Sequence, residues 1–458
     1  MKKPTRWIYA AALAASLATL AACGGGDSGI AGTPVTRVAP VPIGPVVPAD
    51  ANIAGGISGL NDSGLVLQLN GASDLALTNG ASFYTFSTAL AAGASYTVTV
   101  KTQPKSLNCT LASPTGTVSA GAGQMLVPVT CTGLPLFAYV SNYGSDDISV
   151  YKVGASGQLT ANGGVVAAGT SPYSVTIDPG GRFAFVANFD SNNVSAYTIG
   201  VNGQLTANGA VVAAGTTPAS VTVDPSGRFA YVANLGGNSV SAYTIGATGQ
   251  LTANGAVVAA GTQPNSVTID PSGRFAYVAN PGSNNVSAYT IGANGQLTAN
   301  GAVVSGGTSS ASVTVDPSGR FAYVANSGSN NISAYTIGVN GQLAANGVAV
   351  ATGISPAGVT VDPSGRFAYV ANAGSNNVSA YTIGANGQLT ANGTKSTGGT
   401  SAYSVTVDSS GRFAYVANYF SNNVTAYTIG ANGQLTANGA VVAAGNRPSS
   451  IAMTYVRP

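Results

Sequence analysis

Side chains able to take part in acid–base or metal chemistry are scarce in this chain. All thirteen acidic residues are Asp, the sequence has neither Glu nor His, and there are three cysteines. Because general acid–base catalysis most often relies on His or on a carboxylate with a tuned pKa, this composition favours a binding protein over an enzyme. It leads us to assign no catalytic residue, no metal and no cofactor.

Six of the Asp residues recur at 46-residue intervals, each with an Arg four positions later, from Asp178 with Arg182 to Asp408 with Arg412. A representative segment is Asp-Pro-Ser-Gly-Arg at residues 224–228. Pro sets the second position of a hairpin turn, and Gly supplies the positive φ that closes it. A pair repeated in every copy cannot mark a single active site, so we predict that these residues cap turns.

The turns belong to a repeat that decides the architecture. The hexapeptide Phe-Ala-Tyr-Val-Ser/Ala-Asn, with Phe for Tyr in one copy, occurs seven times at constant spacing. Each copy is one strand among four: a strand of the Ser-Val-Thr-Val/Ile-Asp type, with Gly358 for Ser in one copy, precedes all but the first copy, and two further strands follow. The copies begin at Phe137, Phe183, Phe229, Phe275, Phe321, Phe367 and Phe413.

Both faces of the hexapeptide strand are apolar. Phe229 and Tyr231 occupy one face, and Ala230 and Val232 the other. A sheet with one bulky and one small apolar face needs a neighbour on each side, which a closed ring provides. We therefore predict an all-β fold in which residues 133–458 form a seven-bladed β-propeller of 46-residue repeats.

The two ends of the repeat region predict how the ring closes. The first hexapeptide, at Phe137, has no preceding strand of its own. The last such strand, around Ser450–Thr454, has no hexapeptide after it. We therefore expect the C-terminal strand to complete the first blade.

The first residues have the features of an export signal. Lys2, Lys3 and Arg6 precede an apolar stretch, and Leu-Ala-Ala-Cys follows at residues 20–23, which resembles the lipobox of bacterial lipoproteins. We interpret residues 1–22 as a lipoprotein signal peptide, Cys23 as the lipidated residue, and the Pro- and Gly-rich residues 23–51 as a tether. An ordinary secretory signal, which would release the protein, is the alternative. We expect lipid anchoring in the cell envelope, with the outer membrane favoured and the periplasmic or surface face left open.

Residues 52–132 contain short apolar or alternating segments between Asn, Asp and Gly turns, which is typical of a small β-sandwich. Cys109 and Cys131 are the cysteines of this region. Because export exposes them to an oxidising compartment, we predict that they form a disulfide. Without Lys2, Lys3 and Arg6 the formal charges balance at thirteen of each sign, which excludes an electrostatic nucleic-acid binder.

Departures from the repeat consensus gather on one rim, in the loops before the first strand and after the second strand of each blade. Ring closure makes blades 7, 1 and 2 consecutive, so these departures form one aromatic sector with a few charges. Clustered aromatic residues suggest recognition of a protein, peptide or glycan. The candidate residues are Tyr143, Asp146, Asp147, Tyr173, Phe189, Asp190, Tyr403, Tyr419, Phe420 and Arg447.

Three alternatives stay open for this rim. The aromatic residues could simply pack against the sandwich, or the propeller could serve as a spacer that binds nothing. A Ca²⁺ site at Asp146, Asp147 and Asp190 is the third possibility, although no twelve-residue calcium loop is present.

The hexapeptide strands together with the Asp-Pro-Ser-Gly-Arg turns resemble the YVTN-type propellers grouped with the lactonase (6-phosphogluconolactonase-like) family. The resemblance covers residues 137–458 and implies hydrolysis of a sugar lactone at the central channel, by a lactonase-type carboxylic ester hydrolase. From the residues themselves, we predict a cell-envelope lipoprotein that acts as a binding scaffold through one rim. Its partners would be the membrane, through the lipid anchor, and an envelope protein or glycan.

Overall fold

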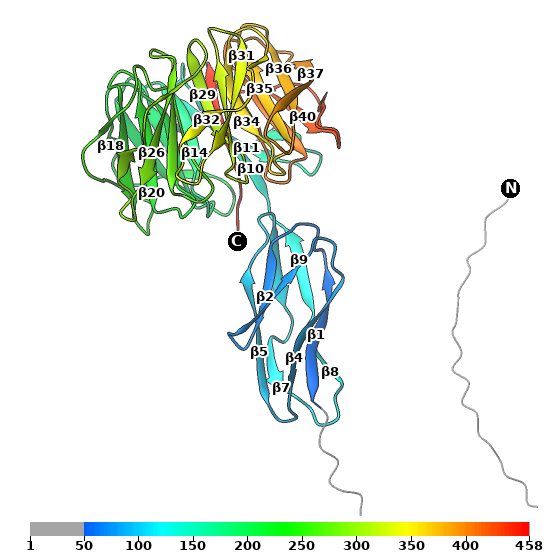
Figure 1. Ribbon diagram of the computed structural model, residues 1–458. Helices are drawn as coiled ribbons and strands as arrows, with labels where there is room; N and C mark the ends of the chain where they lie inside the picture. Colours follow the sequence, from blue (N-terminus) through cyan, green and yellow to red (C-terminus); the bar gives the residue numbers. More distant parts are fainter. Residues whose placement is uncertain (1–49, 458) are drawn as a thin grey trace, which may run out of the picture. The chain divides into compact units, whose positions relative to one another are not determined.

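The computed structural model describes residues 50–457. The predicted signal peptide, Cys23 and all but the last two residues of the predicted tether lie outside this range. Every regular element of the described residues is a β-strand (Figure 1). No segment of residues 50–457 forms a helix of the length and apolarity needed to cross a membrane.

The N-terminal domain is a sandwich of two sheets. One sheet has the strand order β4-β1-β9-β6 with β8 paired to β1, and the other has the order β3-β2-β5-β7. Alternate residues of β2 are buried, as the period of a strand with one covered face requires. The strands are β1 (Ala51–Ser58), β2 (Leu65–Leu69), β3 (Ser73–Leu77), β4 (Phe83–Leu90), β5 (Ser95–Thr102), β6 (Leu107–Leu111), β7 (Thr115–Thr117), β8 (Gln124–Leu126) and β9 (Val129–Gly133).

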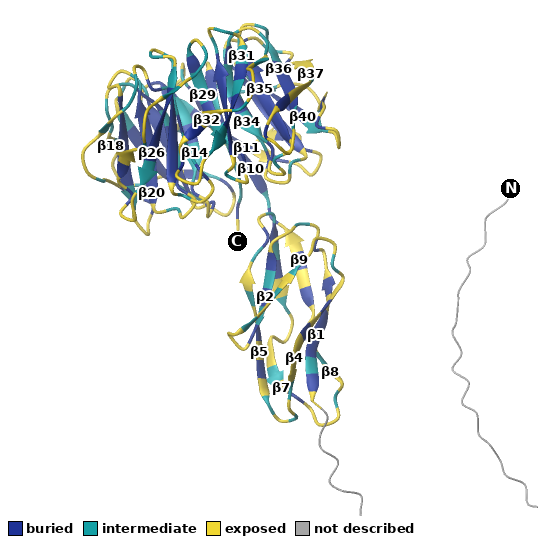
Figure 2. Cartoon of the chain, in the orientation of Figure 1, coloured by how far each residue is buried: buried dark blue, intermediate teal, exposed yellow. Residues whose placement is uncertain are grey.

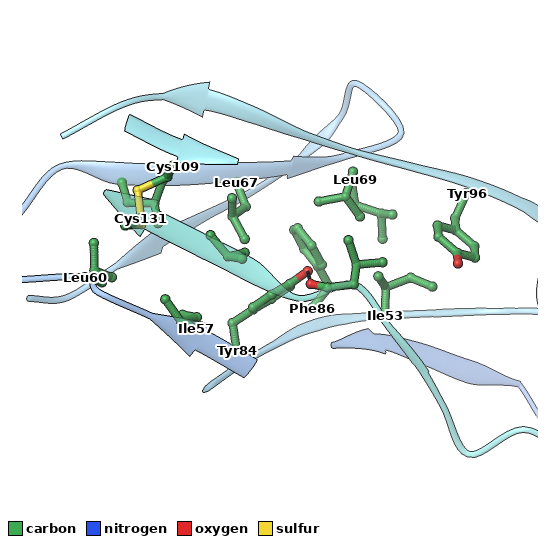
Figure 3. Packing of buried hydrophobic residues seen from close by; sticks show 14 of the residues in the cluster. Ile53, Ile57, Leu60, Leu67, Leu69, Tyr84, Phe86, Tyr96, Cys109 and Cys131 are labelled. Atoms are coloured by element: carbon green, nitrogen blue, oxygen red, sulfur yellow. Dashed lines mark hydrogen bonds between the residues drawn. A yellow bond between two sulfur atoms is a disulfide. The ribbon is translucent and has the colours of Figure 1, made fainter. Parts of the chain in front are cut away.

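The sandwich core lies between these sheets. Ile53 from β1 and Phe86 from β4 pack in one buried cluster with Leu67 and Leu69 from β2 (Figure 3). Tyr84 is buried in the same cluster, and its hydroxyl donates a hydrogen bond to the carbonyl of Val127 at 2.7 Å. The buried hydroxyl thus has the partner that burial of a polar group requires.

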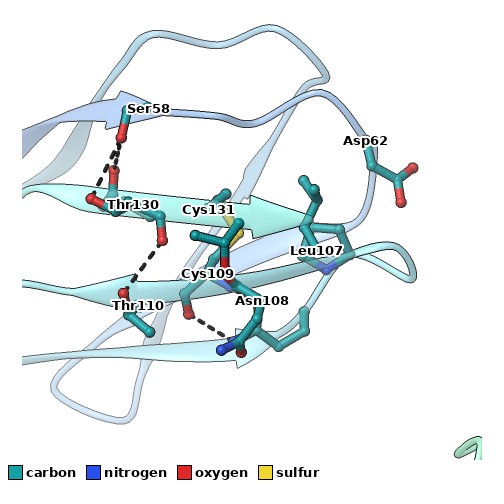
Figure 4. Close-up of a disulfide and its surroundings, with 12 residues drawn as sticks. Ser58, Asp62, Leu107, Asn108, Cys109, Thr110, Thr130 and Cys131 are labelled. Atoms are coloured by element: carbon teal, nitrogen blue, oxygen red, sulfur yellow. Dashed lines mark hydrogen bonds between the residues drawn. A yellow bond between two sulfur atoms is a disulfide. The ribbon is translucent and has the colours of Figure 1, made fainter. Parts of the chain in front are cut away.

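The predicted disulfide is present. Cys109 on β6 and Cys131 on β9 are directly opposite one another in the antiparallel pair and are joined through their sulfur atoms (Figure 4). Both cysteines are buried in the sandwich core. The bond therefore links two strands of the same sheet at the end of the sandwich that leads into the propeller sequence.

The propeller consists of seven antiparallel sheets, and each is one repeat of the sequence. Within each blade we number the strands from the centre of the ring outward. The first strands, for blades 1 to 7, are β43 (Pro448–Tyr455), β14 (Pro172–Ile177), β19 (Pro218–Val223), β24 (Ser266–Ile269), β29 (Ser310–Val315), β34 (Pro356–Val361) and β38 (Ala402–Val407). The second strands are β10 (Leu136–Asn142), β15 (Phe183–Asn188), β20 (Phe229–Asn234), β25 (Phe275–Asn280), β30 (Phe321–Asn326), β35 (Phe367–Asn372) and β39 (Phe413–Asn418).

The outer half of each blade holds the third strand and a short fourth strand. The fourth strand is divided into two pieces in every blade but blade 6. The third strands are β11 (Asp147–Val153), β16 (Asn193–Ile199), β21 (Ser239–Ile245), β26 (Asn285–Ile291), β31 (Asn331–Ile337), β36 (Asn377–Ile383) and β40 (Asn423–Ile429). The fourth are β12 (Leu159–Ala161) with β13 (Val166–Ala167), β17 (Leu205–Ala207) with β18 (Val212–Ala213), β22 (Leu251–Ala253) with β23 (Val258–Ala259), β27 (Leu297–Ala299) with β28 (Val304–Ser305), β32 (Leu343–Ala345) with β33 (Val350–Ala351), β37 (Leu389–Ser396), and β41 (Leu435–Ala437) with β42 (Val442–Ala443).

The ring closes through blade 1, as the repeat count predicts. β43 pairs antiparallel with β10, in a register that places Phe137 opposite Thr454 and Val140 opposite Ile451. A strand from the C-terminal end of the chain thus completes a blade that begins directly after the sandwich. This pairing also brings blades 7, 1 and 2 next to one another.

Neighbouring blades pack a bulky face against a small one. Phe183 and Phe185 of blade 2 share a buried cluster with Ala230 and Val232 of blade 3, and the same arrangement recurs around the ring. Figure 2 shows the hexapeptide strands as buried and the connecting loops as largely exposed. The alternation of large and small faces is the packing that the hexapeptide predicts.

Tyrosine hydroxyls join adjacent blades at these contacts. In six blades the second strand carries a Tyr whose hydroxyl donates to the carbonyl of a turn glycine in the next blade; Tyr231, for example, donates to Gly295 at 2.9 Å. Blade 2 has Phe185 at this position, so its contact with Gly249 in blade 3 lacks the hydroxyl. The contact between blades 2 and 3 is therefore the one without this hydrogen bond.

The repeated Asp and Arg residues serve the turns, and in five of the six pairs the side chains form no ion pair. Asp224 Oδ1 accepts hydrogen bonds from the backbone N–H groups of Arg228 at 2.9 Å and Phe229 at 2.7 Å. The Arg228 guanidinium lies over the Phe229 ring, 4.8 Å from its centroid, and all six repeated Arg residues stack in this way. Of the six Asp–Arg pairs, only Asp178 and Arg182 come within 4 Å, at 3.7 Å.

Candidate binding site at the mouth of the central channel

The innermost strands of all seven blades enclose a cavity at the centre of the ring. Its volume is about 150 Å³, and each blade lines it with two successive residues of its first strand or, in blade 4, with the first residue of that strand and the residue before it. The residues nearest the rim are Tyr173, Ala219, Asn265, Ala311, Ala357, Tyr403 and Ser449. The next residues inward are Ser174, Ser220, Ser266, Ser312, Gly358, Ser404 and Ser450.

Two tyrosines distinguish one side of this cavity from the other. Tyr173 of blade 2 and Tyr403 of blade 7 extend across blade 1, and their hydroxyl groups are hydrogen-bonded to each other. Ser449 stands between them, so blade 1 leaves room for both rings. The remaining blades present small side chains and Asn265. The cavity therefore has an aromatic wall on blades 7, 1 and 2 and a small, polar wall opposite.

A second row of rings supports these tyrosines. Tyr143, Phe189 and Tyr419 follow the second strands of blades 1, 2 and 7. Tyr143 contacts Tyr173, Phe189 and Tyr419 with centroid distances of 5.9, 6.1 and 6.1 Å. Phe189 lies 5.4 Å from Tyr173, and Tyr419 lies 5.3 Å from Tyr403. The aromatic residues singled out from the sequence are thus brought together, and their rings pack on one another within the propeller.

Phe420 forms the outer edge of this aromatic cluster. Its ring lies 5.2 Å from that of Tyr419, and 67% of the residue is exposed. Phe420 does not line the cavity. It is accessible to a large partner on the rim but not to a small molecule held in the channel.

The cavity wall carries no formal charge. Its residues are Tyr, Ser, Ala, Asn, Gly and Val, and none of them is Asp, Lys or Arg. Burial raises the pKa of Tyr173 well above its usual value, and the neighbouring Tyr403 hydroxyl adds to the shift. Burial also raises the pKa of Tyr403. Both hydroxyls are therefore neutral hydrogen-bonding groups at physiological pH, and neither is a base.

Two of the predicted rim residues, Asp146 and Asp147, occupy positions that are Asn or Ser in the other blades. Asp146 Oδ1 accepts the N–H of Ser171 at 2.7 Å, as Asn192 Oδ1 accepts the N–H of Thr217. Asp147 accepts a hydrogen bond from the side chain of Asn142 at 2.6 Å. Their carboxylates therefore hold the turns of the rim, and neither lines the cavity.

Asp190 and Arg447 flank the aromatic cluster from opposite sides. Asp190 accepts a hydrogen bond from the Ser171 hydroxyl at 2.6 Å. The Arg447 guanidinium lies 6.0 Å from the centroid of Tyr419. Both side chains are exposed. Within residues 50–457 no group of three acidic or sulfur side chains is placed to hold a metal ion.

Sequence comparison among the blades did not single out the polar wall of the cavity. The serines of the first strands look like ordinary repeat positions, because Ser recurs there in most blades. Two signals were visible: Asn265, which stands where the other blades have Ala, Tyr or Ser, and Gly358, which interrupts the Ser series. Their significance depends on contacts between blades that no single repeat reveals.

The fold and the site together define a seven-bladed β-propeller with a ligand-sized cavity at its axis. The model of the family described as "Lactonase, 7-bladed beta-propeller" matches residues 129–217, 206–308, 296–386 and 377–452, which is more than half of the chain. The chain belongs to this family.

Solved structures similar to the chain share its propeller. One is a periplasmic gluconolactonase of Pseudomonas aeruginosa, at 24% identity and a TM-score of 0.63, covering 70% of this chain and 100% of that one. Another is a proposed 6-phosphogluconolactonase from Bacteroides fragilis, at 21% identity and a TM-score of 0.62, covering 70% and 98%. A protein from Lactobacillus plantarum matches at 22% identity and a TM-score of 0.63, covering 70% and 99%. No curated protein matches the chain.

Proposed function

We propose that the propeller binds one uncharged sugar ring, a monosaccharide or its lactone, at the mouth of the central channel. The observation that carries the proposal is the cavity of about 150 Å³ with an aromatic wall, a polar wall and no charged lining residue. A cavity of roughly this volume holds a single six-membered ring. A longer glycan or a peptide could only reach it with one end.

The two walls match the two kinds of surface on a sugar ring. The faces of a pyranose are lined with C–H groups and pack against aromatic rings such as Tyr173 and Tyr403. Its edge carries hydroxyl groups, which pair with the serine and Asn265 side chains. Because burying an unpaired charge is costly, the uncharged wall favours a neutral ring over a phosphorylated one.

Binding is tested by calorimetric titration of the purified chain with D-glucose, D-glucono-1,5-lactone and gluconate. We expect the neutral compounds to bind more tightly than gluconate, and Tyr173→Ala and Tyr403→Ala to weaken binding at least about tenfold, which corresponds to ~1.4 kcal/mol. Phe420→Ala is the matched control, because it removes an aromatic ring of the same cluster that does not line the cavity. Absence of binding at millimolar sugar would refute the proposal and support the spacer hypothesis. Binding by both tyrosine variants as tight as that of the wild type would also refute the proposal.

Lactone hydrolysis is the second candidate function, and it is favoured by membership of the lactonase family and by the names of the relatives. In this reaction water adds to the lactone carbonyl and the ring C–O bond breaks, giving the hydroxy acid. The carboxylate beside the cluster that could take a proton from water is that of Asp190, which the Ser171 hydroxyl orients. The cavity wall itself supplies hydrogen-bond donors but no base.

Hydrolysis is measured as acid release from D-glucono-1,5-lactone at constant pH, after subtraction of the spontaneous rate. A lactonase would accelerate acid release above that background and lose the acceleration in Asp190→Asn. Binding of the lactone without any acceleration would leave the sugar-binding function and eliminate the hydrolase.

We also propose that the chain is held in the cell envelope by a lipid on Cys23, on the strength of the Leu-Ala-Ala-Cys segment. Two or more acyl chains give stable attachment, whereas one alone is marginal. Growth with labelled palmitate should label the wild-type chain in membranes and leave Cys23→Ser unlabelled. Equal labelling of both would show that Cys23 is not the lipidated residue.

A further inference from the structure

Serine side chains in the channel wall connect neighbouring blades at five of the seven junctions. Ser174 Oγ accepts a hydrogen bond from the backbone N–H of Val221 at 3.2 Å, and the same contact recurs at four further junctions between blades at 3.2–3.4 Å. The valine N–H groups are free for this contact because each valine stands at a position of the antiparallel pair that exchanges no backbone hydrogen bonds. Serine–amide hydrogen bonds thus run around most of the channel wall.

Two junctions lack this hydrogen bond. Between blades 7 and 1 Ser404 is present, but its Oγ does not accept the N–H of Ile451; between blades 6 and 7 the hydroxyl itself is absent. Gly358 stands where the other blades have Ser, so no hydroxyl meets the N–H of Val405. Val405 pairs with Val416, and Asp408, three residues later, forms a hydrogen-bonded pair with Phe413. Because hydrogen-bonded and non-hydrogen-bonded pairs alternate along an antiparallel ladder, Val405 belongs to a non-hydrogen-bonded pair. Its N–H therefore also points away from its own blade. Val405 and its neighbour Val359 are the valines that line the cavity. The missing side chain leaves a notch with an amide donor in it.

The φ angle of Gly358 does not demand glycine, but the neighbouring blade does. Gly358 is outside the left-handed region, unlike the turn glycines of the propeller. A Cβ at this position would lie 2.9 Å from the carbonyl oxygen of Tyr403, closer than a side chain tolerates without movement of the backbone, and 3.6 Å from the amide nitrogen of Val405. The close approach of blade 7 therefore keeps a serine out of this position and leaves the N–H of Val405 without the partner that its counterparts have.

We propose that the notch at Gly358 is the subsite that takes a ligand oxygen, and that it orients the bound ring. A hydroxyl or carbonyl oxygen of the sugar would take the place of the absent serine Oγ and accept the N–H of Val405. Tyr403, in the same strand, forms the aromatic wall beside the notch. A ring packed on Tyr403 therefore presents its edge to this donor. The inference rests on the proposed sugar-binding function and adds to it which blade fixes the ligand.

Two substitutions of Gly358 distinguish the effect of filling the notch from the effect of giving the N–H of Val405 a hydrogen-bond acceptor. Gly358→Ser supplies the missing hydroxyl, and Gly358→Ala fills the space without an acceptor. We expect both to weaken binding of D-glucose or D-glucono-1,5-lactone about tenfold, the effect of one lost hydrogen bond and a filled space. Both add a Cβ close to the Tyr403 carbonyl and should lower the melting temperature, Gly358→Ser by less because it alone pairs the N–H of Val405.

Tyr277→Phe is the control, since it removes a hydrogen bond between blades 4 and 5 at a residue that does not line the cavity. It should lower the melting temperature and leave sugar affinity unchanged. Deoxyglucoses lacking one hydroxyl locate the contact: the wild type should discriminate against one of them, and Gly358→Ser should lose that discrimination.

The outcomes distinguish the proposed sugar-binding function from the proposed subsite at Gly358. If the wild type binds neither sugar, both the proposed function and the subsite are refuted. If the wild type binds and both Gly358 variants bind as tightly, only the subsite is refuted. If Gly358→Ser fails to fold, Gly358→Ala and the deoxyglucose series decide the question.

Discussion

The contact between blades 2 and 3 should be strengthened by a single hydroxyl group. Six blades use a Tyr hydroxyl to bond a turn carbonyl of the next blade, at 2.7–2.9 Å, and Phe185 leaves this bond out. The space for it exists, because Gly249 stands as close to Phe183 as its counterparts stand to their Phe neighbours. Phe185→Tyr therefore adds a bond whose geometry is already set by its surroundings.

The expected gain follows from the net value of one buried hydrogen bond, about 1 kcal/mol. Unfolding entropies near 2.1 cal/mol/K per residue give roughly 0.7 kcal/mol/K for a propeller of about 320 residues, so the melting temperature should rise by about 1.5 °C. The reverse change, Tyr277→Phe, should cost ~1 kcal/mol or more because it leaves the carbonyl of Gly341 without its donor.

Urea unfolding followed by near-ultraviolet circular dichroism measures both variants, since the buried tyrosines dominate that signal. The one tryptophan of the chain is Trp7, within the predicted signal peptide, so tryptophan fluorescence is not a suitable probe. Equal stabilities of wild type, Phe185→Tyr and Tyr277→Phe would show that these hydroxyls contribute nothing between blades. A loss of stability in Phe185→Tyr would show that blade 2 packs differently from its counterparts.

Three further predictions concern the sandwich and the turns. Replacing Cys109 and Cys131 by Ser should lower the free energy of unfolding of the sandwich by roughly 3 kcal/mol and leave the propeller transition in place, as measured by urea unfolding with and without reductant. Asp224→Ala should cost about 2 kcal/mol because it frees buried turn N–H groups, whereas Arg228→Ala should cost under about 1 kcal/mol; equal costs would contradict the assignment of the turn to Asp224 alone. Burial raises the pKa of Tyr84 to about 12. The contribution of its neutral hydroxyl to the free energy of unfolding is therefore complete below pH 10 and falls by about 1.4 kcal/mol per pH unit from pH 10 to 12. Tyr84→Phe should remove this pH-dependent loss from the alkaline unfolding curve.

The fold could be predicted from the sequence because the same residue pattern recurs in all seven repeats. Alternation of large and small residues around Phe229 predicts two covered faces, and the unpaired strand at Ser450 predicts closure in blade 1. Ring closure also predicts that Tyr143, Phe189 and Tyr419 meet, although they are separated by up to 276 residues. Residues at equivalent positions of neighbouring repeats lie close together in the ring, so their proximity can be predicted from the repeat spacing.

The hydrogen-bond and packing partners of each side chain could not be predicted from the repeat pattern. Asp146 differs from its Asn counterparts in charge and so looked like a ligand contact, yet an Asp oxygen accepts the N–H of Ser171 as an Asn oxygen does. Arg228 was predicted to cap the turn together with Asp224, but its guanidinium lies over the adjacent Phe229 ring and its Nε donates to Ser226. Sequence reports which positions differ between blades; only the contacts between blades show whether a difference changes the chemistry.

The pairing of β43 with β10 has a consequence for biosynthesis. β10 is made before any other strand of the propeller and receives its partner only when β43 has emerged. Until then blade 1 has a free inner edge, and the seventh junction between blades cannot form. A chain interrupted anywhere before Pro448 would keep that edge exposed and open to proteases or chaperones. The order of synthesis thereby makes closure of the ring a check that the whole propeller has been produced.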